Sequence, residues 1–264
     1  MYPLRVICLL GVTATTLMLG AGAAAAAPLA ATADYLLTLG GINVATAKVA
    51  LKDAADHYSI DLSAQVAGLG SLVASGTAKV DAAGTSTGDT LRSEDFELLT
   101  HANDSDFSVS VQFAAGNVSA FVVRPPLLNN IDRVPIERSQ LYGVNDMLSA
   151  FILKGGQLDR SLCARDLHIF TGVERFDLDM HYLADDRATS LRTGYQGPVV
   201  QCQLKYIPIS GHFTNSDMTN YLAKSDRIFL WYAPLGATGY FIPYRVLVTT
   251  SVGDLSMVLT SLKD

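Results

Sequence analysis

The sequence is poor in the features that mark nucleic-acid-binding and membrane-spanning proteins. Only 17% of its 264 residues are charged, the 25 acidic residues outnumber the 19 basic ones, and no run of basic residues occurs. Because nucleic-acid binding depends on clustered Lys and Arg side chains that neutralise phosphates, nucleic acid is not expected as a partner. After the N-terminal region, no stretch reaches the roughly 18 uninterrupted apolar residues of a membrane helix, so no further membrane span is predicted.

Short motifs of common catalytic and metal-binding sites are also missing. The five histidines form neither HExxH nor another short metal-ligand spacing, and neither a GxSxG nucleophile motif nor a complete phosphate-binding loop occurs. We therefore expect no metal, no cofactor and no enzymatic activity. An enzyme remains the weaker alternative, in which the fold brings His168 and His181 to Asp177 or Asp179. Solvent exposure on one strand face explains most of these residues more simply.

The one long apolar run lies at the N-terminus. After Arg5, it extends from Val6 to the alanines that end at Ala27, where several A-x-A sites overlap. This layout predicts a cleaved signal peptide over residues 1–27 and a single β-rich domain of a bacterial-type periplasm over residues 28–264. The alternative is an uncleaved anchor, which the weakly apolar alanines and glycines of the second half disfavour.

Cysteine is scarce. Cys8 lies in the predicted signal peptide, so the rest of the chain keeps only Cys163 and Cys202, without the short spacing of a metal knuckle. In an oxidising compartment a disulfide is the natural prediction. Closing a loop of about 39 residues (202 − 163) would stabilise the fold by about 3–4 kcal/mol. The alternative is a pair of buried free thiols.

Alternation of apolar and polar residues dominates what is present. It is clearest over residues 58–66, 107–113 and 175–182, and predicts strands with one buried and one solvated face. Gly40-Gly41 lies between two apolar runs and predicts a tight hairpin. We expect a mainly β fold, an antiparallel meander curled into a barrel or an open half-barrel.

Two kinds of interruption break this alternation. Turn-forming residues recur every 8 to 20 residues or so, and residues 81–84 and 184–186 are among the predicted turns. One segment instead has helical spacing, with Leu148, Phe151 and Ile152 at i, i+3 and i+4. Because capping residues precede these positions and glycine follows them, we predict one short mid-chain helix over residues 145–154.

Aromatic residues gather near the carboxyl end. Phe229, Trp231, Phe241 and Tyr244 lie in predicted strands, where alternation would let them line an apolar interior. They are the candidate lining of an apolar ligand site. The alternative is that they fill an ordinary core.

A family resemblance extends over nearly the whole chain after residue 27. The pieces that carry it are Tyr35-x-x-x-x-Gly40-Gly41-Ile42, Asp146–Ala150, Cys163–Leu178, Tyr195–Cys202, Pro208–His212, Trp231–Pro234 and Pro243–Val246. Together they resemble the domain of unknown function 3108, a family of exported Gram-negative envelope proteins. The resemblance implies a periplasmic, largely β fold akin to lipoprotein-carrier-like proteins, with no assigned activity and no catalytic residues. Thr171 and Val173-Glu174 depart from the more polar, arginine-rich turn that the family leads us to expect.

These observations favour a non-enzymatic cell-envelope protein that binds a lipid, a lipoprotein or another envelope component in its β scaffold. The alternative is a structural or protein-interaction module with a filled core. An apolar cavity of roughly several hundred Å³ would distinguish the two, because a filled interior has no room for a ligand.

Overall fold

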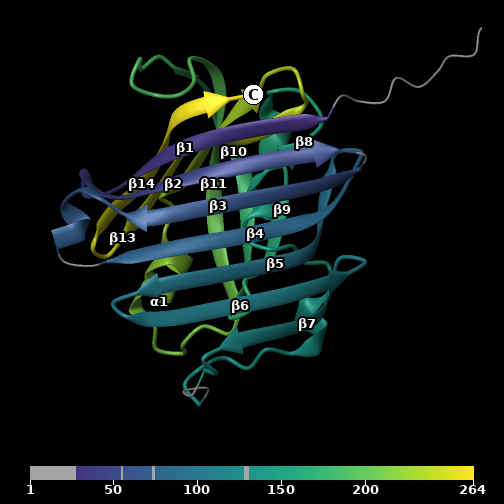
Figure 1. The fold of residues 1–264 in the computed structure, drawn as a ribbon, viewed down its shortest axis with the longest axis vertical. Coiled ribbons are helices and arrows are strands. Elements are labelled where there is room, and N and C mark those ends of the chain that lie inside the picture. The colour runs from purple at the N-terminus through teal and green to yellow at the C-terminus, as the bar shows by residue number, and fades with distance from the viewer. Residues whose placement is uncertain (1–27, 55, 73–74, 128–130) are drawn as a thin grey trace, which may run out of the picture.

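The computed structural model describes residues 28–54, 56–72, 75–127 and 131–264, and the predicted signal peptide lies outside them. Over these ranges the fold is built on an antiparallel sheet of 14 strands (Figure 1). The strands are β1 (Leu29–Leu39), β2 (Ile42–Ala54), β3 (His57–Val66), β4 (Gly76–Thr87), β5 (Thr90–Ala102), β6 (Ser105–Ala114), β7 (Asn117–Arg124), β8 (Leu153–Lys154), β9 (Asp166–Phe170), β10 (Arg175–Ala188), β11 (Gly197–Ser210), β12 (Ile228–Leu235), β13 (Tyr240–Thr250) and β14 (Gly253–Lys263).

The sheet is a meander, which confirms the predicted class. Its strand order is β7-β6-β5-β4-β3-β2-β1-β14-β13-β12-β11-β10-β9, with β8 paired to β13 off this path. The sheet is not closed, because its outer strands β7 and β9 do not pair with each other. Instead, isolated bridges join Tyr142 to Asn117 at the start of β7 and Asn145 to Ile169 in β9.

The predicted strands at residues 58–66, 107–113 and 175–182 all lie within observed strands, β3, β6 and β10. The predicted hairpin is also present, since Gly40 and Gly41 form the turn between β1 and β2 with φ of +56° and +82°. Positive φ at both central positions is what a tight hairpin of this length favours.

Two predicted turns are wrong. Residues 81–84 lie within β4 and residues 184–186 within β10, where the pairing shifts register instead of reversing direction. At Gly84 an added Cβ would lie 1.9 Å from the carbonyl oxygen of Arg92 on the neighbouring strand. The glycine therefore permits close approach of two strands at an irregularity, which is a role that resembles a turn signal in sequence.

The predicted helix over residues 145–154 is wrong as an α-helix. Only Ser149–Phe151 forms a 3₁₀ turn, and Leu153–Lys154 becomes β8. The backbone N–H of Asn145 bonds to His168 and its carbonyl accepts from Phe170, while the N–H groups of Leu148 and Ser149 bond to the Asp146 side chain. The bonds to Asp146 are those of a helix N-cap, and the Ala150 N–H bonds to the Asp146 carbonyl. The turn nevertheless ends at Ile152, whose backbone is extended, because Leu153 and Lys154 pair with β13.

The α-helix of the described part is α1 (Asp217–Lys224), where Ser216 caps the amino end by accepting a hydrogen bond from the N–H of Thr219. Shorter 3₁₀ segments are η1 (Gly68–Leu72), η2 (Arg138–Leu141), η3 (Ser149–Phe151) and η4 (Arg160–Cys163). No helix within the ranges given above has both the length and the apolar character needed to cross a bilayer.

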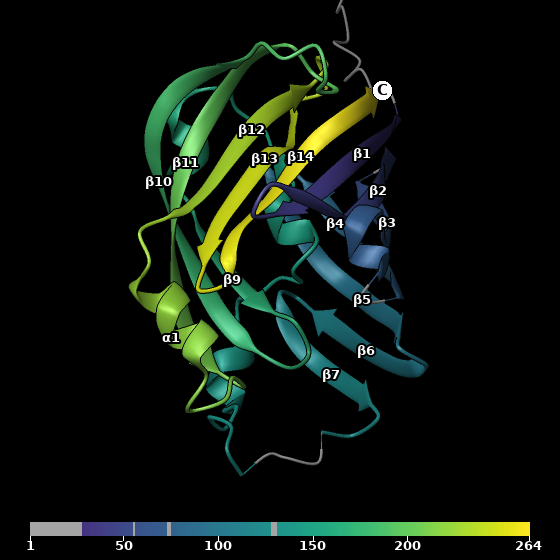
Figure 2. The same cartoon turned by 90° about the vertical axis from the view of Figure 1, so that its left-hand side faces the viewer.

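The sheet curls so that its two ends face each other across the interior (Figure 2). The Tyr35 hydroxyl in β1 donates to the carbonyl of Pro243 in β13 at 2.9 Å, and the rings of Phe121 in β7 and Phe170 in β9 meet edge to face at 5.2 Å. Burial raises the pKa of Tyr35, so its hydroxyl stays protonated and continues to donate this bond.

The predicted disulfide is confirmed. Cys163 in η4 is bonded to Cys202 in β11, both side chains are fully buried, and their Cα atoms are 5.4 Å apart. The bond ties the segment before β9 to the far side of β10 and lies in a core cluster with Leu162, Met180 and Tyr232.

Candidate functional site

An apolar cavity of about 330 Å³ lies inside the curled sheet. Strands β1 to β4 form one side, β13 and β14 form another, and the segment after Gly143 covers it. Its lining residues are almost all aliphatic or aromatic: Tyr35, Leu37, Ala47, Val49, Leu62, Val80, Met147, Leu148, Phe151, Ile152, Pro243, Val246, Val248, Leu255 and Met257. The cavity therefore offers dispersion contacts and almost no hydrogen bonds.

The position of the cavity follows from how the core divides. Buried residues form two clusters, and the cavity lies where they meet, since Tyr35 and Val80 belong to the first cluster while Phe151 and Val246 pack against the second. Two lining residues, Met147 and Leu255, are themselves exposed at the surface. The cavity thus opens beside them.

A buried polar network fixes the segment that covers the cavity, residues 145–152, which we call the wall segment. The Asp146 carboxyl group accepts hydrogen bonds from the N–H groups of Leu148 and Ser149 at 2.8 Å each, and from the Ser93 hydroxyl at 2.5 Å. The Tyr58 hydroxyl donates to Ser149 Oγ at 2.8 Å. All five residues but Leu148 are buried, so the network is shielded from competing water.

Burial raises the pKa of Tyr58, with the nearby Asp146 adding to the effect, so its hydroxyl remains a donor. Because Asp146 turns the backbone at Leu148, the apolar side chains of Leu148, Phe151 and Ile152 form part of the cavity wall.

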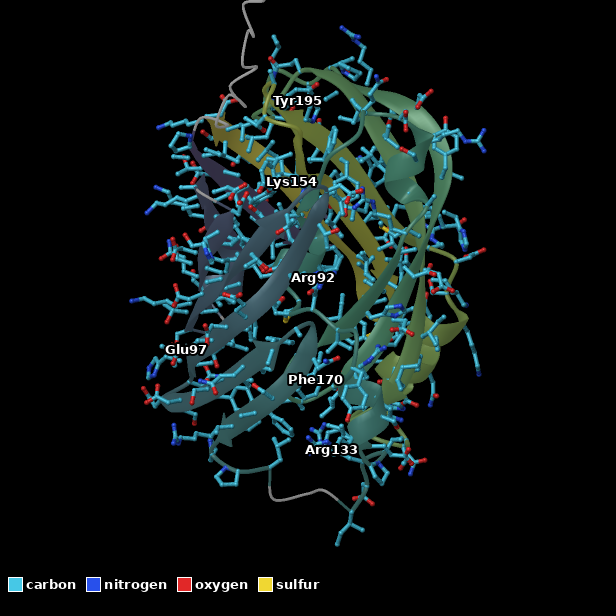
Figure 3. All side chains as sticks on the ribbon, turned by 90° about the vertical axis from the view of Figure 1, so that its right-hand side faces the viewer. Arg92, Glu97, Arg133, Lys154, Phe170 and Tyr195 are labelled. Atoms are coloured by element: carbon cyan, nitrogen blue, oxygen red, sulfur yellow. A yellow bond between two sulfur atoms is a disulfide. The ribbon has the colours of Figure 1, made fainter. Side chains whose placement is uncertain are left out.

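A second polar cluster holds the chain just after the wall segment. Asp53 of β2 accepts hydrogen bonds from Lys154 Nζ at 3.0 Å, from the Tyr240 hydroxyl at 2.5 Å and from Ser86 Oγ at 2.6 Å. Figure 3 labels Lys154 at this place between the two sides of the sheet. Burial raises the pKa of Asp53, but these hydrogen bonds and the Lys154 charge outweigh it, and the net pKa is lowered. The ionised carboxylate therefore joins β2 to β8 and β13.

The aromatic residues proposed from the sequence as cavity lining lie elsewhere in the core. Trp231 and Tyr244 belong to the first cluster and Phe241 to the second, while Phe229 packs against the first and lies 6.1 Å from the Trp231 ring. None of the four is among the residues that line the 330 Å³ cavity.

The polar atoms of two of these aromatics explain their positions. Trp231 Nε1 donates to Asp186 at 3.0 Å with the Arg245 guanidinium over its ring, and the Tyr244 hydroxyl bonds to Thr193 Oγ1 at 3.2 Å. A buried indole or phenol needs such a partner, and the cavity offers almost none. Aliphatic side chains line it instead.

The acid–base cluster considered from the sequence is formed only in part. His168 Nδ1 lies 2.7 Å from Asp177 Oδ1, and Arg175 forms an ion pair with the same carboxylate. His168 lines an outer cleft of about 450 Å³, but Asp177 is not part of that lining. Over the described ranges, His181 and Asp179 make no side-chain hydrogen bond or ion pair, and no group of three or more His, Cys, Asp or Glu side chains is placed to hold a metal ion.

Comparison with known proteins gives a family and no function. A family described as "Protein of unknown function (DUF3108)" matches residues 34–260, which include every residue that lines the cavity. No curated protein and no solved structure matches the chain. The geometry of the cavity is therefore the strongest guide to function.

Proposed function

We propose that this chain, which belongs to the DUF3108 family of proteins of unknown function, is a non-enzymatic periplasmic protein that binds an acyl chain of a lipid or lipoprotein inside its curled sheet. The single observation that carries the proposal is the 330 Å³ cavity with its apolar walls. In this proposal the open meander acts as a half-barrel around the ligand.

The size and chemistry of the cavity both favour an acyl chain. Ligand sites in proteins span about 300–1,000 Å³, and a cavity at the small end of that range suits one acyl chain rather than a bulky multi-ring or two-chain ligand. Its walls carry no charged side chain. A polar ligand would leave its own groups unpaired there, whereas a hydrocarbon chain gains the contacts that the wall residues lack when it is absent.

The alternative, a structural or interaction module with a filled core, fits the interior less well. A packed core has few voids larger than a water molecule. A cavity of 330 Å³ with apolar walls, beside two clusters of buried residues, supports the binding proposal over a filled core.

The proposal is tested with a fatty acid that carries a dansyl group, whose fluorescence rises in apolar surroundings. The purified protein should bind this probe with saturation. Ala47→Phe puts a ring into the cavity and should weaken binding by at least about tenfold, because the probe loses buried apolar area. Val49→Phe, from the same strand, should act in the same direction, so the result does not depend on one variant.

The matched control is Ala50→Phe. Ala50 lies in β2 three residues from Ala47 and on the opposite face of the sheet, since successive side chains of a strand alternate. The Ala50→Phe variant should bind the probe with the same affinity as the unmodified protein. Equal binding by all variants, or no binding by the unmodified protein, would contradict an acyl-chain site in this cavity.

A further inference from the structure

Three turns that are distant in sequence lie together at one end of the sheet. They connect β1 to β2 at Gly40-Gly41, β3 to β4 through η1, and β13 to β14 at residues 251–252. Their strands are consecutive neighbours in the sheet, and the Gly40 N–H bonds to the Asp254 carbonyl at 2.9 Å. In turn, an added Cβ at Gly68 of η1 would lie 2.6 Å from the carbonyl oxygen of Asn43, so η1 packs on the start of β2. Figure 1 shows the three turns together at its left-hand edge.

These turns expose aliphatic side chains. The exposed fractions are 49% for Ile42, 60% for Leu69, 70% for Val252 and 37% for Leu255. We call these four residues the neutral rim. Ile42 begins β2 after the first turn, Leu69 lies in η1, and Val252 and Leu255 lie in and just after the β13–β14 turn.

Charge is absent from all three connections. The sequence has no Asp, Glu, Lys or Arg from residue 35 to 47, from 62 to 78, or from 246 to 253. Asp254, the residue before Leu255, is exposed, and its carboxylate lies 4.0 Å from the Arg227 guanidinium. Exposed turns are normally among the most polar parts of a protein. Three adjacent uncharged turns with aliphatic tips indicate that this end meets an apolar phase.

The neutral rim is continuous with the mouth of the cavity. Leu255 belongs to both, since it lines the cavity and is exposed. Leu37 and Val248, also in the lining, are each only two residues from the end of their strands at the same turns. An acyl chain that leaves the cavity at Leu255 would enter whatever covers the rim.

We propose that the neutral rim docks on the surface of a lipid bilayer, with Ile42, Leu69 and Val252 inserted among the lipids and the cavity mouth held against them. The inference rests on the proposed function, because it gives the bound acyl chain its route. A protein partner fits the rim less well: the centres of protein interfaces are rich in aromatic and Arg side chains that give directional contacts, and the rim has neither. Aliphatic tips without polar partners suit fluid hydrocarbon.

Charge predicts which bilayer the rim prefers. Residues 28–264 hold 18 basic and 25 acidic side chains, because one of the 19 basic residues, Arg5, precedes them, and 18 − 25 = −7. A negatively charged protein with an uncharged contact surface should bind vesicles of zwitterionic phosphatidylcholine. Binding should be insensitive to salt and should weaken as an anionic lipid is added.

The test is flotation of the purified protein with phosphatidylcholine vesicles. Leu69→Asp and Val252→Asp should each lower the partition coefficient of the protein between vesicles and water by at least about tenfold. Each variant loses an inserted aliphatic side chain and gains a charge. The control is Leu191→Asp, which changes a residue that is 91% exposed in the β10–β11 connection, away from the rim, and should leave vesicle binding unchanged. Far-ultraviolet circular dichroism checks that all three variants are folded.

The outcomes separate this inference from the proposed function. The two rim variants should still bind the soluble dansyl fatty acid with unchanged affinity, because neither residue lines the cavity. Normal probe binding with no vesicle binding by the unmodified protein would overturn membrane docking and leave the cavity proposal standing. Absent probe binding would instead contradict the proposed function. If the rim substitutions convert a dimer to a monomer on gel filtration without changing vesicle binding, the rim joins two copies and the inference is wrong.

Discussion

Replacement of Asp146 by alanine tests how the wall segment is held. The substitution removes the acceptor of hydrogen bonds from the N–H groups of Leu148 and Ser149 and from the Ser93 hydroxyl. A typical hydrogen bond contributes about 1 kcal/mol net, so the loss of these bonds predicts a decrease of about 3 kcal/mol in the free energy of unfolding. Because Asp146 is fully buried, the N–H and hydroxyl groups that lose their acceptor have little access to water.

The assay for Asp146→Ala is urea denaturation followed by circular dichroism, with Asp185→Ala as the matched control. Asp185 is exposed in β10 and makes no side-chain hydrogen bond in the described part of the chain, so its replacement should leave the unfolding free energy unchanged. Asp146→Ala should also weaken binding of the dansyl fatty acid, because Leu148 and Phe151 lose their fixed positions in the wall. A stability loss below about 1 kcal/mol would refute the role assigned to this network.

Three further predictions concern stability. Replacing both Cys163 and Cys202 with alanine should lower the free energy of unfolding by about 3–4 kcal/mol. Alkylation of the unmodified protein, unfolded without reductant, should label neither cysteine, and labelling of both would contradict the disulfide. Because the pKa of Asp53 is lowered, its ionised form should add stability that is present above its ordinary pKa of about 4 and is lost as the pH falls through the folded-state pKa. The difference in the free energy of unfolding between the unmodified protein and Asp53→Asn should therefore become smaller as the pH is lowered. A difference that does not change with pH would contradict a stabilising role of the ionised Asp53. Gly172→Ala should lower the free energy of unfolding by more than about 1 kcal/mol, since φ is +87° and the new Cβ would lie 2.1 Å from Val109 Cγ1. Gly116→Ala is the control, with φ of +78° and no atom within 4 Å of the new Cβ, and should lower the free energy of unfolding by less. Equal losses in the two variants would contradict the role of the Val109 contact.

Local patterns in the sequence were enough to predict much of the fold. Period-2 alternation placed β3, β6 and β10, and it also put Leu62 on the buried face where it now lines the cavity. Gly40-Gly41 indicated its hairpin, and the scarcity of cysteine reduced the disulfide to one pairing. Each of these depends on neighbours in sequence or on elimination, so no knowledge of the tertiary structure was needed.

The wall segment shows where such reasoning stops. Its i, i+3, i+4 pattern and its capping aspartate were real, but Asp146 is held by Ser93, 53 residues earlier, and Asn145 by β9. Tertiary hydrogen bonds therefore overrode a local helical pattern. The amphipathic spacing still had meaning, since Leu148, Phe151 and Ile152 face one cavity.

The cavity and the neutral rim could not be derived from the sequence for a related reason. Aromatic clustering predicted a lining of Phe229, Trp231, Phe241 and Tyr244. The observed lining consists mostly of aliphatic residues from β1 to β4, β13 and β14, whose sequence pattern is that of ordinary core positions. The uncharged stretches around Gly40, Gly68 and Val252 are visible in the sequence. Only the strand order, which places β14 beside β1, brings them to one end.

Native mass spectrometry of the protein purified from the cell envelope tests the central proposal most directly. The proposed function predicts a population heavier than the chain by the mass of one lipid, with the lipid released on collisional activation and identifiable in the same experiment. Ala47→Phe should lose this species while Ala50→Phe keeps it. Protein that is free of lipid in repeated preparations, and that remains so after incubation with vesicles, would contradict an acyl-chain site in the cavity.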